Sequence, residues 1–172
     1  MIIEILKQLL RFVLLALLQV LVLNNLQIHG MFNPYIYPLF LLLLPMRMPQ
    51  WLLLTLGFAT GIMIDMFSNT AGMHAAASVL MCYMRPQVMR ITEPSGGYEP
   101  TDKPSLSHMG FRWFATYASI LVVIHHLFFF FIETLEFGQV GFMILKILMS
   151  TALSLLLILL IEFFFRTKKH GY

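Results

Sequence analysis

The stretch Gly61-Ile-Met-Ile-Asp65-Met-Phe-Ser-Asn-Thr-Ala-Gly72-Met-His74 decides how this chain folds. It closes one apolar run, makes a short polar turn at 68–71 and opens a second apolar run. Because the turn is so short, the two runs can only form an antiparallel hairpin. A carboxylate at the edge of hydrocarbon is costly unless a partner or water holds it. The fold must therefore provide a partner for Asp65.

Small residues line both sides of this predicted hairpin. Gly57, Gly61 and Asp65 recur at every fourth position and share one helix face, and the second run opens with small residues. Small residues let membrane helices approach closely. We favour Asp65 as a cap that accepts backbone N–H bonds near Gly72 and His74, where the helix dipole stabilises an anion. The other interpretation is a contact with a ligand or a partner.

Composition identifies the class of protein. The 172 residues are 59% hydrophobic and only 11% charged, with a mean hydropathy of +0.83. Soluble domains carry about 25% charged residues, so an apolar fraction this large indicates an all-α integral membrane protein with one membrane domain. The single Cys82 can form no internal disulfide. Lys7 and Arg11 before an apolar run resemble a signal peptide, but no small-residue cleavage site follows, so we expect a retained first helix.

Hydropathy predicts six spans, since a spanning helix needs about 20 mostly apolar residues. We place these spans at about 9–28, 34–46, 49–67, 72–88, 113–132 and 139–165, with a polar connection at about 89–112. The second span is short and contains Pro38 and Pro45, so it is either a kinked span or a re-entrant piece.

Charge supports an even number of spans. With six, the basic residues of the N-terminal segment, the second and fourth connections and the tail fall on one side, and only Lys146 is left over. The fourth connection is counted with Arg85, Arg90, Lys103 and Arg112. Lys and Arg collect in cytoplasmic loops. We therefore predict that both termini are cytoplasmic and that the connection at 92–110 is a mobile cytoplasmic loop. A tolerated insertion is our favoured interpretation of that loop, ahead of a docking site for a partner.

Several polar residues lie within the predicted spans. For Lys146 the default interpretation is that it snorkels outward, and the alternative is a pair with Asp65, Glu133 or Glu136. The pair with Asp65 is the hypothesis that their similar depth suggests. His125 and His126 point about 100° apart on a helix and cannot chelate one metal side by side, so we interpret them as interhelical hydrogen-bonding groups. The remaining candidates either make polar contacts between helices or line a small cavity: Gln19, Asn24 and Gln27.

Catalytic and cofactor motifs are missing from the sequence. It has no zinc-protease, nucleophile-elbow, Walker or dinucleotide fingerprint. Its His, Asp and Glu residues lack metal-ligand spacing, and its scattered basic residues form no nucleic-acid patch. We expect no enzymatic activity, cofactor, metal or nucleic acid. The basic tail, Arg166, Lys168 and Lys169, fits contact with anionic membrane lipids.

The pattern G-x-x-x-D-x-x-x-x-x-x-G-x-H, carried by Gly61, Asp65, Gly72 and His74, resembles the rod shape-determining protein MreD family. The small size, the number of spans and the basic tail add to the resemblance. The family implies a non-enzymatic component of the bacterial cell-elongation complex in the plasma membrane. Such a protein binds the bitopic MreC and, through it, connects MreB to RodA and the elongation transpeptidase, which build side-wall peptidoglycan.

The family also looks like the substrate-binding subunits of energy-coupling-factor transporters, which have a similar six-helix arrangement. Fold alone does not fix function, so a second hypothesis is a vitamin-type transporter subunit. Its ligand pocket would lie on the non-cytoplasmic side and be lined by Asn24, Asp65, His74 and Lys146.

Overall fold

A computed structural model describes residues 2–26, 33–137 and 140–165. Its elements are all helices, including one π-helix (η1) and one 3-10 helix (η2). In chain order they are α1 (Ile2–Leu17), η1 (Leu18–Val22), η2 (Leu23–Asn25), α2 (Pro38–Leu42), α3 (Gln50–Ser68), α4 (Met73–Ile91), α5 (Leu106–Met109), α6 (Phe111–Phe137) and α7 (Val140–Phe164).

Within the described ranges, four helical stretches are long and apolar enough to cross a membrane. They are Ile3–Asn25, Gln50–Ser68, Phe111–Leu135 and Met143–Phe164, close to the first, third, fifth and sixth predicted spans. Leu10, Leu135 and Leu148 are each more than half exposed on these helices. Such a surface is stable only in lipid or against a partner, and the chain is therefore an all-helical, membrane-embedded protein.

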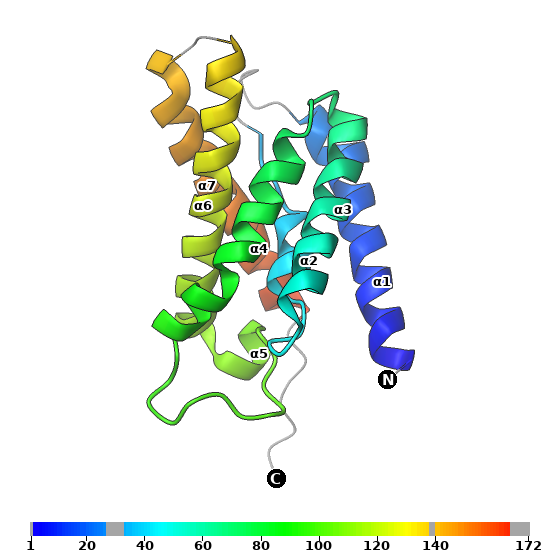
Figure 1. The fold of residues 1–172 in the computed structure, drawn as a ribbon, viewed down its shortest axis with the longest axis vertical. Coiled ribbons are helices and arrows are strands. Elements are labelled where there is room, and N and C mark those ends of the chain that lie inside the picture. The colour runs from blue at the N-terminus through cyan, green and yellow to red at the C-terminus, as the bar shows by residue number, and fades with distance from the viewer. Residues whose placement is uncertain (1, 27–32, 138–139, 166–172) are drawn as a thin grey trace.

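The helices form an elongated bundle, shown in Figure 1. The turn between α3 and α4, residues 69–72, lies at the upper end, which we call the hairpin end. The connection at 92–105 lies at the lower end, which we call the loop end, and α1 also begins there. α4 packs chiefly against α3 and α6, and α6 packs against α7.

The predicted fourth and second spans differ from the other four. α4 extends the predicted 72–88 to Ile91 and carries Arg85 and Arg90, which keeps its hydropathy below that of the four apolar helices. In the predicted 34–46 span only Pro38–Leu42 is α-helical. At 1.5 Å per residue this helix is about 7.5 Å long. Pro38 starts it, because a missing N–H is tolerated in the first turn.

The segment at 33–45, which we call the inner segment, lies at the centre of the bundle. Residues 34–44 are all buried. Ile36 and Leu39 belong to the larger of two apolar clusters, whereas Tyr35 and Tyr37 belong to the smaller one. The two clusters therefore meet along this segment, and the surrounding helices wrap around it.

The first predicted span is a helix of changing pitch. After Leu17 the α-helix widens into the π-helix Leu18–Val22 and then tightens into the 3-10 helix Leu23–Asn25. Single π turns inside helices often occur at functional sites. Here the π turn contains Gln19, which is fully buried despite its polar side chain.

Candidate functional site

The hairpin of α3 and α4 is as tightly packed as its glycines predict. A methyl group added at Gly61 would lie 2.5 Å from the Ala75 nitrogen and 2.6 Å from the His74 oxygen. At Gly57 it would lie 2.8 Å from Cys82 Sγ and 3.1 Å from the Ser78 oxygen. The glycines therefore allow the two backbones to touch, as expected for small residues between membrane helices.

Asp65 caps the start of α4, which confirms the favoured interpretation of this residue. Its Oδ1 accepts hydrogen bonds from His74 N at 3.0 Å and from Thr70 Oγ1 at 2.5 Å, and its Oδ2 accepts one from Ala75 N at 2.9 Å. The side chain is 4% exposed. These donors, together with the helix dipole, offset the cost of burying the carboxylate.

Two left-handed residues shape the turn so that the cap can form. Asn69 ends α3 with φ of 54°, and Gly72 precedes α4 with φ of 82°. Glycine adopts this region without a steric penalty, and asparagine tolerates it. Gly72 therefore aligns the first N–H groups of α4 with the carboxylate of Asp65.

His74 connects the hairpin to the inner segment. Its Nδ1 lies 3.1 Å from the hydroxyl of Tyr37, and that hydroxyl also contacts Ser78 Oγ at 3.3 Å and His125 Nε2 at 2.5 Å. The four side chains are buried. The predicted interhelical role of His125 is confirmed, because it joins α6 to the inner segment. Tyr37 is thus held by side chains of α4 and α6 at the start of α2.

Polar side chains also hold the extended backbone that precedes α2. Gln19 Nε2 donates to the Pro34 carbonyl at 3.2 Å, while Gln19 Oε1 accepts from Ile36 N at 2.8 Å. Ser154 Oγ of α7 accepts from Tyr35 N at 2.8 Å. Non-helical backbone at membrane depth is tolerated only where protein or water satisfies its polar groups. Here Gln19 and Ser154 satisfy three of them, the Pro34 carbonyl and the N–H groups of Tyr35 and Ile36.

Asn24 and His126 add further contacts of the predicted kind. Asn24 Oδ1 accepts from Gln19 Nε2 at 2.9 Å, and Asn24 Nδ2 donates to Ser68 Oγ at 3.0 Å. His126 lies 3.1 Å from Ser154 Oγ. Both residues therefore link separate helices. Gln27, predicted alongside Asn24, lies outside the described residues.

Arg85 holds the other end of the inner segment, a role that the sequence analysis missed. Its Nε donates to Tyr117 Oη at 2.7 Å, and its Nη1 donates to the Pro45 carbonyl at 3.3 Å. Its Nη2 contacts the carbonyls of Leu42 and Leu44, and Tyr117 Oη donates to Leu42 at 3.0 Å. The guanidinium thus satisfies carbonyls at the end of α2, where the helix dipole favours a cation.

The predicted assignment of Arg85 to a loop is therefore corrected. The residue is 1% exposed and lies inside α4. The sequence contained a signal, because Arg85 falls within the predicted span 72–88, where an arginine requires partners.

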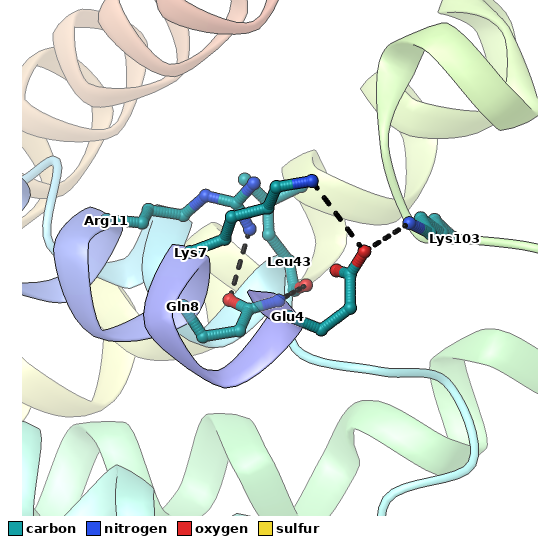
Figure 2. A network of polar contacts seen from close by, with 6 residues as sticks. All are labelled: Glu4, Lys7, Gln8, Arg11, Leu43 and Lys103. Carbon is teal, nitrogen blue, oxygen red and sulfur yellow. Dashed lines mark hydrogen bonds and ion pairs between the residues drawn. The ribbon is translucent and has the colours of Figure 1, made fainter. Parts of the chain in front are cut away.

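The loop end of the inner segment also contacts α1. Figure 2 shows Gln8 Nε2 donating to the Leu43 carbonyl at 3.5 Å and Arg11 Nη1 donating to Gln8 Oε1 at 3.2 Å. On the outer side of the same network, Glu4 lies 3.8 Å from Lys7 Nζ and 3.5 Å from Lys103 Nζ. These exposed ion pairs are individually weak, and neither involves the inner segment, which α1 contacts through Gln8.

Lys146 pairs with Glu133, one of the three partners that we considered. Its Nζ lies 3.1 Å from Glu133 Oε2, and both side chains are about one quarter exposed. The hypothesis of a pair with Asp65 is wrong, because that carboxylate is occupied by the start of α4. The side chain of Glu136 lies outside the described residues.

The polar residues together form a framework of contacts between the helices and the inner segment. Groups of three or more His, Cys, Asp or Glu side chains that could hold a metal do not occur within 2–26, 33–137 and 140–165. The side chains described above instead bond one another, the backbone of the inner segment or, in the case of Asp65, the backbone at the start of α4. Fold and site thus define a helical membrane protein built around a discontinuous inner segment. Comparisons with family models, curated proteins and solved structures find no match to this chain.

Proposed function

We propose that this chain is a non-enzymatic membrane component of the bacterial cell-elongation complex, of the MreD type. In this role it binds MreC and, through MreC, supports the assembly of MreB, RodA and the transpeptidase for side-wall synthesis. The observation that carries the proposal is the geometry of the motif. Gly61 brings the helices together, Asp65 and Gly72 form the cap, and His74 reaches Tyr37. The motif residues thus serve one structural purpose, as expected for a scaffold.

The alternative, a vitamin-type transporter subunit, finds support in one feature. Discontinuous segments at the centre of a bundle often form ligand sites in transporters, and the inner segment is discontinuous. Against it, each residue assigned to that pocket is already bonded within the protein. Asn24 bonds Gln19, Asp65 bonds the start of α4, His74 bonds Tyr37 and Lys146 bonds Glu133. A ligand would have to displace these contacts, so we favour the scaffold.

The proposed topology is six spans in the bacterial plasma membrane, with both termini in the cytoplasm. Among the described residues, basic side chains occur at the start of α1, at 45–49, near the end of α4, in the 92–105 connection and at the start of α6. Figure 1 places these parts at the loop end. Lys146 is the exception. The bias supports a cytoplasmic loop end, and six spans would correspond to the six-helix arrangement of energy-coupling-factor subunits.

Co-purification tests the scaffold proposal directly. The tagged chain is expressed with the MreC of its own cell, solubilised in mild detergent and captured, with a tagged membrane protein of similar size as the control bait. We expect MreC to be recovered with this chain only, and we expect depletion of the chain to cause loss of rod shape. Recovery of no MreC by a folded protein, together with saturable binding of a vitamin, would establish the transporter alternative instead.

A further inference from the structure

The connection between α4 and α6, treated above as a mobile loop, makes defined contacts with the bundle. Tyr98 Oη donates to the Met89 carbonyl at 2.7 Å and accepts from Trp113 Nε1 at 3.2 Å. Further along, Leu106 is 2% exposed, and its N–H donates to Glu162 Oε2 of α7 at 3.0 Å. The connection is therefore fastened to α4, α6 and α7 across the loop end.

A chain of contacts leads inward from Tyr98. The Trp113 ring meets that of Tyr98 edge-on and stacks on that of Tyr117, with centroids 4.7 Å apart and planes 18° apart. Tyr117 Oη then donates to the Leu42 carbonyl and accepts from Arg85. Each contact in this series is direct, and the last one ends on the backbone of the inner segment.

We propose that the 92–105 connection is a clasp that sets the position of the inner segment, with Tyr98 as the residue that closes it. The Tyr98 hydroxyl bonds both the end of α4 and Trp113, so it fixes the indole ring. The indole ring fixes Tyr117, and Tyr117 shares the Leu42 carbonyl with Arg85. A molecule that bound the exposed connection and drew Tyr98 away would therefore loosen the far end of α2.

The series of contacts from Tyr98 leads into the protein interior through Tyr117. Tyr117 and Arg85 are 0% and 1% exposed, whereas Glu99 in the connection is exposed. Coupling between distant sites can be carried by a contiguous set of packed and hydrogen-bonded groups that has two arrangements. The series from Tyr98 to Leu42 provides such a set, and it begins on a surface that a partner can reach.

Hydrogen–deuterium exchange of the purified full chain in detergent tests the clasp. Tyr98→Phe removes only the hydroxyl. Tyr83→Phe makes the same change on an exposed ring of α4 and serves as the matched control. Loss of one or two hydrogen bonds raises a local opening equilibrium roughly fivefold. We expect peptides that cover 38–48 to exchange about fivefold faster in Tyr98→Phe and at the native rate in Tyr83→Phe.

Repeating the substitution in a Trp113→Leu variant tests whether the effect passes through the Trp113 ring. In Trp113→Leu the chain of contacts is already broken, so adding Tyr98→Phe should leave exchange at 38–48 unchanged. An increase confined to 89–98 in Tyr98→Phe, or an undiminished increase in the Trp113→Leu background, would overturn the proposal. The measurement uses the chain alone, so its outcome is independent of whether MreC binds.

Discussion

Gly61→Ala is the change that most directly tests the packing of the α3–α4 hairpin. The new methyl group would lie 2.5 Å from the Ala75 nitrogen, about 0.9 Å closer than an ordinary contact of 3.4 Å. The obstacle is backbone, which cannot rotate aside. The two helices must therefore separate by nearly this distance at the point where their contact is closest.

Such a separation also breaks the Asp65 cap. The bonds from Asp65 to His74 N and Ala75 N, now 3.0 and 2.9 Å, would lengthen to about 3.8–3.9 Å, and a contact of 3.6 Å is no longer a hydrogen bond. Overpacking alone costs about 1–3 kcal/mol, and each bond to a charged group contributes about 1.5–3 kcal/mol. We expect Gly61→Ala to lower the free energy of unfolding by at least about 3 kcal/mol.

Two other glycines provide matched controls. At Gly57→Ala the closest atom is Cys82 Sγ at 2.8 Å, the end of a side chain, and the nearest backbone atom is the Ser78 oxygen at 3.1 Å, a milder backbone contact than at Gly61. The variant gains the same helix propensity of about 1 kcal/mol as Gly61→Ala. Gly72→Ala meets open space and costs about 1–2 kcal/mol for its positive φ. Unfolding in mixed micelles with increasing SDS, followed by circular dichroism, ranks the three. Equal losses at Gly57 and Gly61 would refute the proposed backbone contact.

Three further sets of substitutions test the polar contacts described above by the same unfolding assay. Asp65→Ala removes three hydrogen bonds to a charged group and should cost at least about 3 kcal/mol, with Asp65→Asn intermediate; a fully stable alanine variant would contradict the capping role. Arg85→Lys keeps the charge, but a lysine cannot reach Tyr117 and the Leu42 carbonyl together, so we expect the free energy of unfolding to fall by about 2–5 kcal/mol. Native stability of this variant would show that the multiple hydrogen bonds of the guanidinium are dispensable. Reversing the charges of both Glu133 and Lys146 should restore most of what each single reversal loses, and a double variant no better than the singles would argue against their pairing.

The hairpin could be predicted from sequence because its determinants are local. Gly57, Gly61 and Asp65 recur at helical spacing, and the bonds of the cap join residues at most ten positions apart. A short turn leaves α3 and α4 only one way to pair. Spacing and composition were therefore enough to predict both the close approach and the cap.

The inner segment could not be predicted in the same way, because its partners are distant in sequence. Tyr37 bonds His125 across 88 positions, and Arg85 reaches Leu44 across 41. Hydropathy reports that 34–46 is apolar but not that its helix is limited to five residues. For the same reason Arg85 was counted as a loop charge, since its value as a cap depends on where the end of α2 lies.

The bond between Tyr35 N and Ser154 Oγ has a consequence for how the protein is made. The two residues are 119 positions apart, so the ribosome must synthesise most of the chain before the amide of Tyr35 can find this acceptor. Because an unsatisfied amide in lipid is costly, the inner segment cannot settle in the bilayer as an independent early helix. We expect the segment to remain near water or within the insertion machinery until α7 has been inserted. A chain truncated before Ser154 should therefore leave this segment unassembled and exposed to proteolysis.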